Sequence, residues 1–576
     1  MPARAPERGD DDDDDDVFAA PPPKRPTMDA SFFDADRAGT SAAIADADAD
    51  ANVNDPSSEL DAKRVRQLVL AFERAYAENV KQRAKHADEP ARFAESEIEL
   101  DCEIKALGQL ASAPELYAEL VRLNVMESVV GILGHENEDV VADTLEVLRE
   151  LTDGDAVESD EEGGKALADA IKRAGGYAAL YAALVRFEDK RGDTRATTSE
   201  ASAAVSSALG IVENLGEIVG TTVDEDSGES CNEAFEGLCD ETDLLGWLLK
   251  RVEKKRVVDE NKLAASEILA IVLQSSARCR KKCLDMNGLD ALLQAVSAYK
   301  KREPEDDGEK ELVENLFDAV CAVVMTPETK DEFLDLEGIE LMLMILRGSS
   351  SGDKKATPFA AIPALKCLDY VTSGNKRACE RFVDAGGLKS LFPAFMGRNV
   401  KTLRKTFGNE AVLEQQTRSS SLLCSMFKNL ADTERRDRLC AKFVEDDHAK
   451  CDRLIELWVE FAKRVSAEQS RLENDDEDLG IELTEEEEYL QKLDAGLATL
   501  EHLTLILANL WATGHAPILR RLYANASQNS ITLGDLRDII REYAHHVGDS
   551  GGEDKRAEQV RAALASLPYA PGERDD

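Results

Sequence analysis

Several short motifs could carry catalytic or metal-binding chemistry. Residues 348–352 read GSSSG, which matches the nucleophile elbow of hydrolases, but that elbow follows a β-strand and this motif stands between two helical patterns. Cys279 and Cys283 are one helical turn apart and could share a metal ion, yet no nearby histidine completes a ligand set. The seven histidines share no common spacing. The sequence therefore predicts no enzyme, no cofactor and no metal site.

A repeated helical phrase organises the chain instead. Its clearest copy is DAGGLKSLFPAF, in which apolar residues follow Gly387 at offsets of 1, 4, 5 and 8. This spacing places the apolar side chains on one stripe of an α-helix. Copies with the same offsets start at Val125, Gly176, Gly288 and Gly338.

These copies start about 50 residues apart, except for one gap of twice that length. We expect the missing copy near Asp243, with an apolar helix that starts at Leu244. A second, longer helical pattern follows most copies after a polar break, and several of these end close to an Asn-Leu pair. The longer helices are expected at Val140–Leu151, Ala201–Ile218, Leu312–Val324, Phe359–Val371 and Ala411–Leu430. Helices repeated at this period are typical of an all-α solenoid, in which each unit buries its apolar face only against its neighbours.

Composition and charge narrow the function classes. The 576 residues are 43% hydrophobic, 5% aromatic and 32% charged, which suits a helical array with a large solvated surface. The net charge of −45 disfavours direct binding to nucleic acid or anionic membranes and favours basic partners. Eleven cysteines without a CxxC pair indicate a reducing compartment. The polar start and short apolar runs predict no secretory signal and no membrane span, so we expect a soluble intracellular protein.

The sequence divides into four parts. Residues 1–57 contain seven consecutive aspartates and a Pro-rich stretch, so we expect a disordered acidic arm. Lys24 and Arg25, which follow three prolines in this arm, are a candidate nuclear import signal. We expect residues 58–116 to form a helical cap and residues 117–547 to form the repeat array. Residues 548–576 would form a tail with one short helix.

The repeats resemble the armadillo repeat, whose third helix closes on Asn-Leu. Longer stretches resemble the beta-catenin-like protein 1 family, and they are FAESEIELD (93–101), GILGHENEDV (131–140), LTDGDAVESDEEG (151–163), ENLFDAVC (314–321), EEEEYLQKLDAGLATLEHL (485–503) and REYAHHVGD (541–549). The resemblance implies an armadillo-type solenoid, a right-handed superhelix of helical repeats, located in the nucleus. It also implies association with the spliceosome's NineTeen complex and binding to basic, localisation-signal-like segments of partners such as its Myb-domain splicing factor. The sequence leaves open whether the array forms a homodimer.

The same resemblance points to a peptide-binding groove. In armadillo arrays the third helices line the concave surface, and their asparagines hold the main chain of an extended peptide, because a carboxamide both donates and accepts hydrogen bonds. The candidate groove asparagines are Asn214, Asn315, Asn429 and Asn509. Neighbouring acidic residues could pair with Lys or Arg side chains of the peptide, and these are Glu213, Glu314 and Asp318.

Two other functions compete with that of a nuclear splicing scaffold. An import adaptor of the importin-alpha type also binds basic peptides, but its groove uses tryptophan with asparagine four residues later. The three tryptophans of this chain are followed at that offset by Arg251, Ala462 and His515, which do not fit. The second competing function is that of a regulatory subunit of an enzyme, which the motifs do not exclude.

Overall fold

The computed structural model describes residues 60–189, 199–224, 227–253, 258–348, 358–430, 433–479, 484–547, 562, 564 and 565. The predicted acidic arm with Lys24 and Arg25 lies outside these residues, as does almost all of the predicted C-terminal tail. The described part is helical except for one antiparallel hairpin, in which strand β1 (Thr222–Val223) pairs with strand β2 (Ser230–Cys231). The all-α prediction is therefore confirmed.

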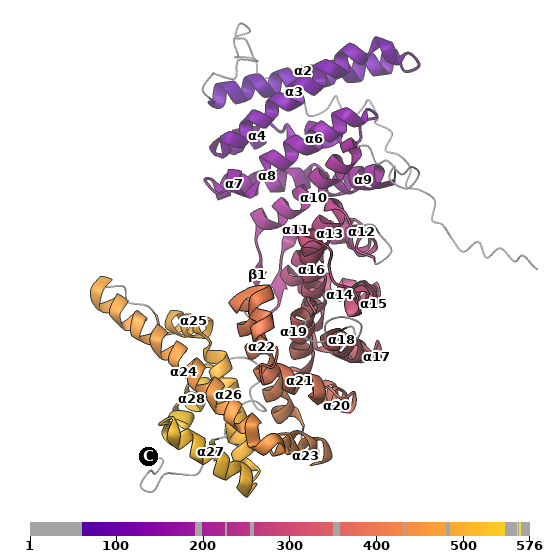
Figure 1. The fold of residues 1–576 in the computed structure, drawn as a ribbon. Helices are drawn as coiled ribbons and strands as arrows, with labels where there is room; N and C mark the ends of the chain where they lie inside the picture. The colour runs from indigo at the N-terminus through magenta and orange to yellow at the C-terminus, as the bar shows by residue number, and fades with distance from the viewer. Residues whose placement is uncertain are drawn as a thin grey trace, which may run out of the picture.

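The helices stack in layers along a curved array, with the N-terminal pair at one end and a cluster of C-terminal helices at the other (Figure 1). The pair consists of α2 (Ala62–Lys85) and α3 (Ala94–Leu107). Helix α2 begins after Asp61, whose carboxylate accepts a hydrogen bond from the backbone N–H of Arg64. This N-cap satisfies one of the unpaired N–H groups of the first turn.

Three helices form each layer of the array. The first helices are α4 (Tyr117–Arg122), α8 (Glu161–Arg173), α11 (Glu233–Glu241), α14 (Ala277–Asp285), α17 (Pro327–Asp335), α20 (Lys376–Asp384) and α23 (Thr433–Ala441). The second helices are α5 (Met126–Ile132), α9 (Gly176–Asp189), α12 (Leu244–Arg251), α15 (Gly288–Val296), α18 (Gly338–Arg347), α21 (Leu388–Phe395) and α24 (Glu445–Leu479). The third helices are α6 (Glu138–Leu151), α10 (Ser199–Val219), α13 (Glu260–Ser275), α16 (Asp307–Val324), α19 (Ala361–Thr372), α22 (Val400–Asn429) and α26 (Leu497–Ala512).

The remaining elements connect or close these layers. They are α7 (Gly154–Val157), α25 (Glu485–Ala495), α27 (Ala516–Gln528), α28 (Leu533–Val547) and four 3₁₀ turns at Pro90–Arg92, Gly108–Ser112, Pro114–Leu116 and Ser297–Lys300. Helix α28 packs on α26 at the C-terminal end of the array.

The repeated phrase corresponds to the turn from first to second helix. The residue before each phrase has a left-handed backbone conformation, with φ between 55° and 77° at Asn124, Gly175, Asn287, Glu337 and Gly386. The glycine that follows packs against the side chain five residues earlier. A Cβ atom at Gly338 would lie 2.5 Å from the Phe333 ring, and the same clash would occur at Gly176, Gly288 and Gly387. At these four positions glycine is therefore required by close approach of the first helix, whereas the copy that starts at Val125 has a side chain there.

The third helices form a continuous ladder. Helices α6, α10, α13, α16, α19, α22 and α26 pack in that order, each against the next. They run down the middle of the array, between α12, α15 and α18 on one side and the C-terminal helices on the other (Figure 1). The buried apolar side chains form one continuous cluster from Val65 to Ile540. This stacking of helical layers, each covering its neighbour, is an armadillo-type α-solenoid.

Among the described residues, no single helix is long and apolar enough to cross a bilayer. Helices α25 and α26 reach that length and composition only together, and they are bent by 74° relative to each other.

Candidate protein-binding site

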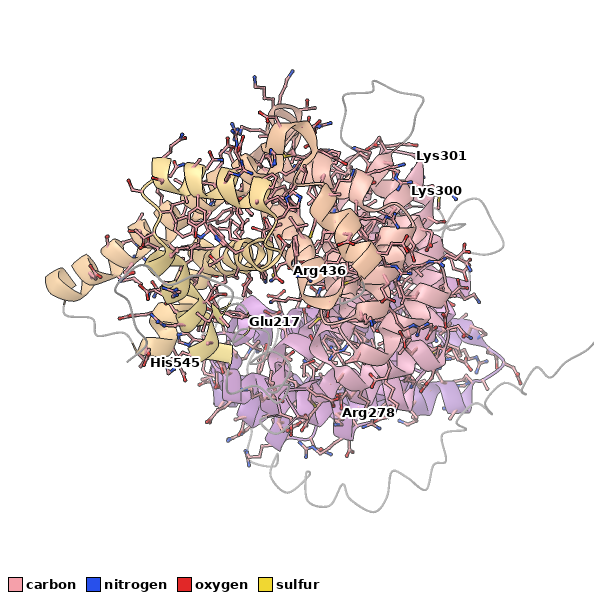
Figure 2. The ribbon with its side chains drawn as sticks, turned by 90° about the horizontal axis from the view of Figure 1, so that it is seen from below. Glu217, Arg278, Lys300, Lys301, Arg436 and His545 are labelled. Atoms are coloured by element: carbon pink, nitrogen blue, oxygen red, sulfur yellow. The ribbon has the colours of Figure 1, made fainter. Side chains whose placement is uncertain are left out.

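A row of carboxylates crosses three adjacent third helices, and we call it the acidic strip. It consists of Glu213 and Glu217 on α10, Glu267 on α13, and Glu311, Glu314 and Asp318 on α16. All six side chains are exposed or half-buried. Seen from below, Glu217 lies on the side of the array that faces the C-terminal helices, whereas Lys300 and Lys301 lie on the far side (Figure 2). We call this side the inner wall of the solenoid. Electrostatic interactions connect Glu217 to the rest of the acidic strip through Glu213, Glu267 and Glu311, so the strip follows this wall.

On the inner wall, the asparagine side chains form hydrogen bonds to the preceding layer of the array. The Nδ2 atom of Asn214 donates to the Arg149 carbonyl at 3.1 Å and to the Thr152 hydroxyl at 3.2 Å, both on the preceding side of the ladder. The Nδ2 atom of Asn315 donates to the Ser266 hydroxyl on α13 at 3.2 Å. Their Oδ1 atoms accept no hydrogen bond from any described residue. Each carboxamide thus ties its layer to the previous one and leaves its acceptor unoccupied.

The glutamates before these asparagines approach the following third helix. Glu213 interacts electrostatically with Glu267 on α13, and Glu314 interacts with Lys366 on α19. Glu217 and Asp318 each lie one helical turn further along the same face. The structure therefore brings together five of the seven predicted groove residues, namely Glu213, Asn214, Glu314, Asn315 and Asp318.

Burial and mutual repulsion perturb the carboxylates of the acidic strip. Burial raises the pKa of Glu213, and the nearby charges of Glu267 and Glu217 raise it further. Burial and then Glu311 raise the pKa of Glu267. For Glu314, burial is again the largest cause, and Asp318 and Glu311 add to the increase in pKa. A cation placed among these groups would relieve both the repulsion and the cost of desolvation.

The acidic strip ends where the chain supplies its own cations. The Nζ atom of Lys366 lies 2.7 Å from Oδ1 of Asp318. On the next helix of the ladder, Arg418 lies 2.7 Å from Glu414 and 3.4 Å from Asp369, and its guanidinium stacks over the ring of Tyr370. The inner wall of α19 and α22 is therefore partly neutralised, whereas that of α10, α13 and most of α16 is not.

The other two predicted groove residues lie apart from the acidic strip. Asn429 is at the last residue of α22, where its Nδ2 donates to the Ser425 carbonyl of the same helix at 2.9 Å. Asn509 donates to the Leu505 carbonyl and accepts from Arg436 on α23 at 3.0 Å, so both of its polar atoms are engaged. Neither residue contributes to the row of carboxylates.

Sequence reasoning missed Glu217, Glu267 and Glu311. Glu217 follows Glu213 by four residues, as Asp318 follows Glu314, and this shared offset was a usable signal. Glu267 stands in a third helix without an Asn-Leu pair, so the motif could not indicate it. Glu311 lies one turn before Asn315 and is recognised only once α13 and α16 are seen side by side.

The described residues, those of the acidic strip included, contain no group of three His, Cys, Asp or Glu side chains arranged to hold a metal ion. Cys279 and Cys283 are both buried, and the Cys279 thiol shares a hydrogen bond with that of Cys239. An open pocket of about 470 Å³ lies between α24 and the turn before α28, and Trp458, Ala462, Ser466 and Ile531 are among its lining residues.

The chain matches one described protein family over most of its length. Residues 42–541 match the model of the family described as catenin-beta-like, Arm-motif containing nuclear. Beta-catenin-like protein 1 of Homo sapiens is 34% identical over 516 residues, covering 88% of this chain and 86% of the relative. The homolog of that protein in Schizosaccharomyces pombe is 28% identical over 536 residues, covering 92% of this chain and 86% of the relative. Among solved structures, an engineered protein superimposes with a TM-score of 0.48 at 17% identity, covering 89% of this chain and 97% of that one. The helical layers and the family match over most of the sequence together show that the chain belongs to the catenin-beta-like family of Arm-motif-containing nuclear proteins.

Proposed function

We propose that this protein is a non-enzymatic nuclear scaffold of pre-mRNA splicing, associated with the NineTeen complex. It binds basic, localisation-signal-like segments of partner proteins, such as a Myb-domain splicing factor, on the acidic strip. The observation that carries the proposal is the row of six carboxylates across α10, α13 and α16, in which only Asp318 forms an ion pair with a described cation. The nuclear and splicing roles are supported by membership of a family described as nuclear and by the resemblance to beta-catenin-like protein 1.

The geometry of the acidic strip suits an extended basic segment. Third helices that pack directly are about 8–10 Å apart, and an extended chain advances about 3.3 Å per residue, so about three peptide residues cover one layer. The Oδ1 atoms of Asn214 and Asn315 can accept hydrogen bonds from the peptide backbone. The flanking glutamates can then pair with Lys and Arg side chains on either side of it.

A charge-matched comparison tests the proposal. The strip variant carries Glu213→Gln, Glu267→Gln and Glu314→Gln. The control variant carries Glu127→Gln, Glu253→Gln and Glu328→Gln, which are exposed residues on or next to first and second helices. A fluorescein-labelled peptide with five consecutive Lys or Arg residues is titrated with each protein, and binding is measured by anisotropy.

We expect the strip variant to bind at least about tenfold more weakly than the wild type, as the loss of several charge pairs implies. The control variant should bind as the wild type does. Equal weakening in both variants would indicate a general effect of net charge and would contradict a specific site. For the splicing role, immobilised wild-type protein should recover splicing proteins from nuclear extract, and the strip variant should recover fewer of them.

A further inference from the structure

We infer that Lys366 determines the specificity of the acidic strip by acting as an internal competitor, a cation of the chain itself that occupies the C-terminal end of the strip. This inference rests on the proposed function and adds a limit on the length of the basic cluster that the strip binds. The strip then selects segments whose cations form a short cluster over α10, α13 and the first part of α16.

The contact between Lys366 and Asp318 carries this inference. Lys366 lies on α19, and its ammonium group is 2.7 Å from Asp318 on α16, so the pair links two neighbouring third helices. The side chains of Lys366 and Asp318 are 28% and 36% exposed, so the pair is accessible to a ligand but shielded enough for its charges to matter. Burial alone would lower the pKa of Lys366, but the hydrogen bond to Asp318 outweighs it and the pKa is raised. Lys366 therefore stays charged at neutral pH.

Lys366 also interacts electrostatically with a second carboxylate of the acidic strip, Glu314. Its charge lowers the pKa of Glu314, against the larger effect of burial. Further along the ladder, Arg418 pairs with Glu414 and Asp369, and its stacking over Tyr370 holds it in place. Cations of the chain thus occupy the wall from Asp318 to α22, whereas no described cation pairs with Glu213, Glu217 or Glu267 on the other side.

A limit on peptide length follows from this division. The open part of the strip spans two helix-to-helix steps, which is about six residues of an extended segment. A peptide cation that reaches Asp318 must first displace Lys366, which then loses a hydrogen-bonded partner of opposite charge. Extra Lys or Arg residues at that end of the peptide therefore add little affinity in the wild-type protein.

Replacing Lys366 with an uncharged residue should remove the limit. In Lys366→Met the apolar stem is kept and Asp318 becomes available. The matched control is Lys376→Met, which removes the same charge from an exposed position on α20. Lys366→Gln is a second variant in case methionine disturbs packing, and a thermal melt of each protein checks its fold.

The experiment compares two labelled peptides by fluorescence anisotropy, one with six consecutive Lys or Arg residues, which fills the open part of the strip, and one with eight, which extends to Asp318. In the wild type and in Lys376→Met we expect similar affinities for the two peptides. In Lys366→Met and Lys366→Gln the longer peptide should gain about fivefold over the shorter one, which corresponds to one additional charge-assisted contact of about 1 kcal/mol.

An unchanged affinity ratio in the Lys366 variants would overturn the inference, and so would an equal gain for both peptides. The strip variant with Glu213→Gln, Glu267→Gln and Glu314→Gln is measured in parallel. If it binds both peptides as tightly as the wild type, the proposed function fails, and this outcome is distinct from failure of the role of Lys366.

Discussion

The Nδ2 atom of Asn315 lies 3.2 Å from the Oγ atom of Ser266, a buried hydroxyl on the preceding third helix. Asn214 makes the equivalent link to Thr152 in an earlier layer, also at 3.2 Å. The asparagine that precedes leucine in these helices therefore connects successive layers through its amide nitrogen. Its carbonyl oxygen stays available on the inner wall, so one side chain can serve both stability and binding.

The first prediction separates these two roles. Asn315→Ala should lower the free energy of unfolding by about 1 kcal/mol, because a hydrogen bond between layers is lost, and it should also weaken binding of a basic peptide. Glu314→Gln should weaken binding without lowering stability, since burial and neighbouring carboxylates already disfavour the charged form of Glu314. Urea unfolding and peptide anisotropy measure the two effects. An Asn315→Ala protein with wild-type stability would contradict the link between layers.

The second prediction concerns the glycine of the repeated phrase. Gly338→Ala would place a methyl group 2.5 Å from the Phe333 ring, so we expect a loss of about 1–3 kcal/mol in the free energy of unfolding. Glu337→Gly, one residue earlier, should have the opposite sign, because Glu337 adopts a left-handed conformation with φ of 56°. Relief of that strain is worth up to about 1 kcal/mol. Stability that changes in the same direction in both variants would refute this account of the turn.

The third prediction is that binding depends on pH. Burial and neighbouring carboxylates raise the pKa values of Glu213, Glu267 and Glu314, and a bound cation favours their charged forms. Peptide binding should therefore release protons, and affinity should fall as pH decreases from 8 to 5. In the strip variant, which lacks these three carboxylates, the pH dependence should be much weaker. A wild-type affinity that stays constant over this range would count against the strip as the binding site.

The fourth prediction concerns Glu501 on α26, which is 4% exposed. Burial raises its pKa to about 8, and the charge of Glu542 on α28 contributes to the increase. Its unfolded-state value is about 4.3, so between these values the folded state holds a proton that the unfolded state has lost. Glu501 should therefore lower the free energy of unfolding as pH rises from about 4 to 8, by up to about 1.4 kcal/mol per pH unit.

Glu501→Gln tests this directly. The variant should be as stable as the wild type near pH 4.5 and more stable at pH 9, as measured by thermal melts at both values. Glu486→Gln on α25, an exposed carboxylate, is the control and should change stability at neither pH. Equal stability of Glu501→Gln and the wild type at pH 9 would show that Glu501 is not buried as described.

The repeated phrase predicted the second helices because its apolar positions are the ones that these helices bury. The missing copy was correctly expected at Leu244, where α12 begins. The short first helices, such as α17 and α20, were not predicted separately, since nine polar-rich residues carry too few apolar positions to show a period. The apolar pattern also does not show the break at Gly496, where φ is 110° and α25 is separated from α26. Helix α27 was also missed.

The candidate site was only partly predictable. Glu213, Glu314 and Asp318 were recognised beside their Asn-Leu pairs, and the structure places them in one row. The role of Lys366 could not be predicted, because its contact with Asp318 joins residues 48 positions apart and depends on how α19 is registered against α16. Asn429 and Asn509 carry the same sequence motif but have their polar atoms directed to Ser425, Leu505 and Arg436.

Cross-linking would test the central claim most directly. A basic peptide bound to the full chain is treated with a carbodiimide, which joins peptide lysines to carboxylates within contact distance, and the linked residues are identified by mass spectrometry. We predict cross-links at Glu213, Glu217, Glu267, Glu311 and Glu314. Cross-links confined to the exposed carboxylates of first and second helices would contradict binding on the inner wall.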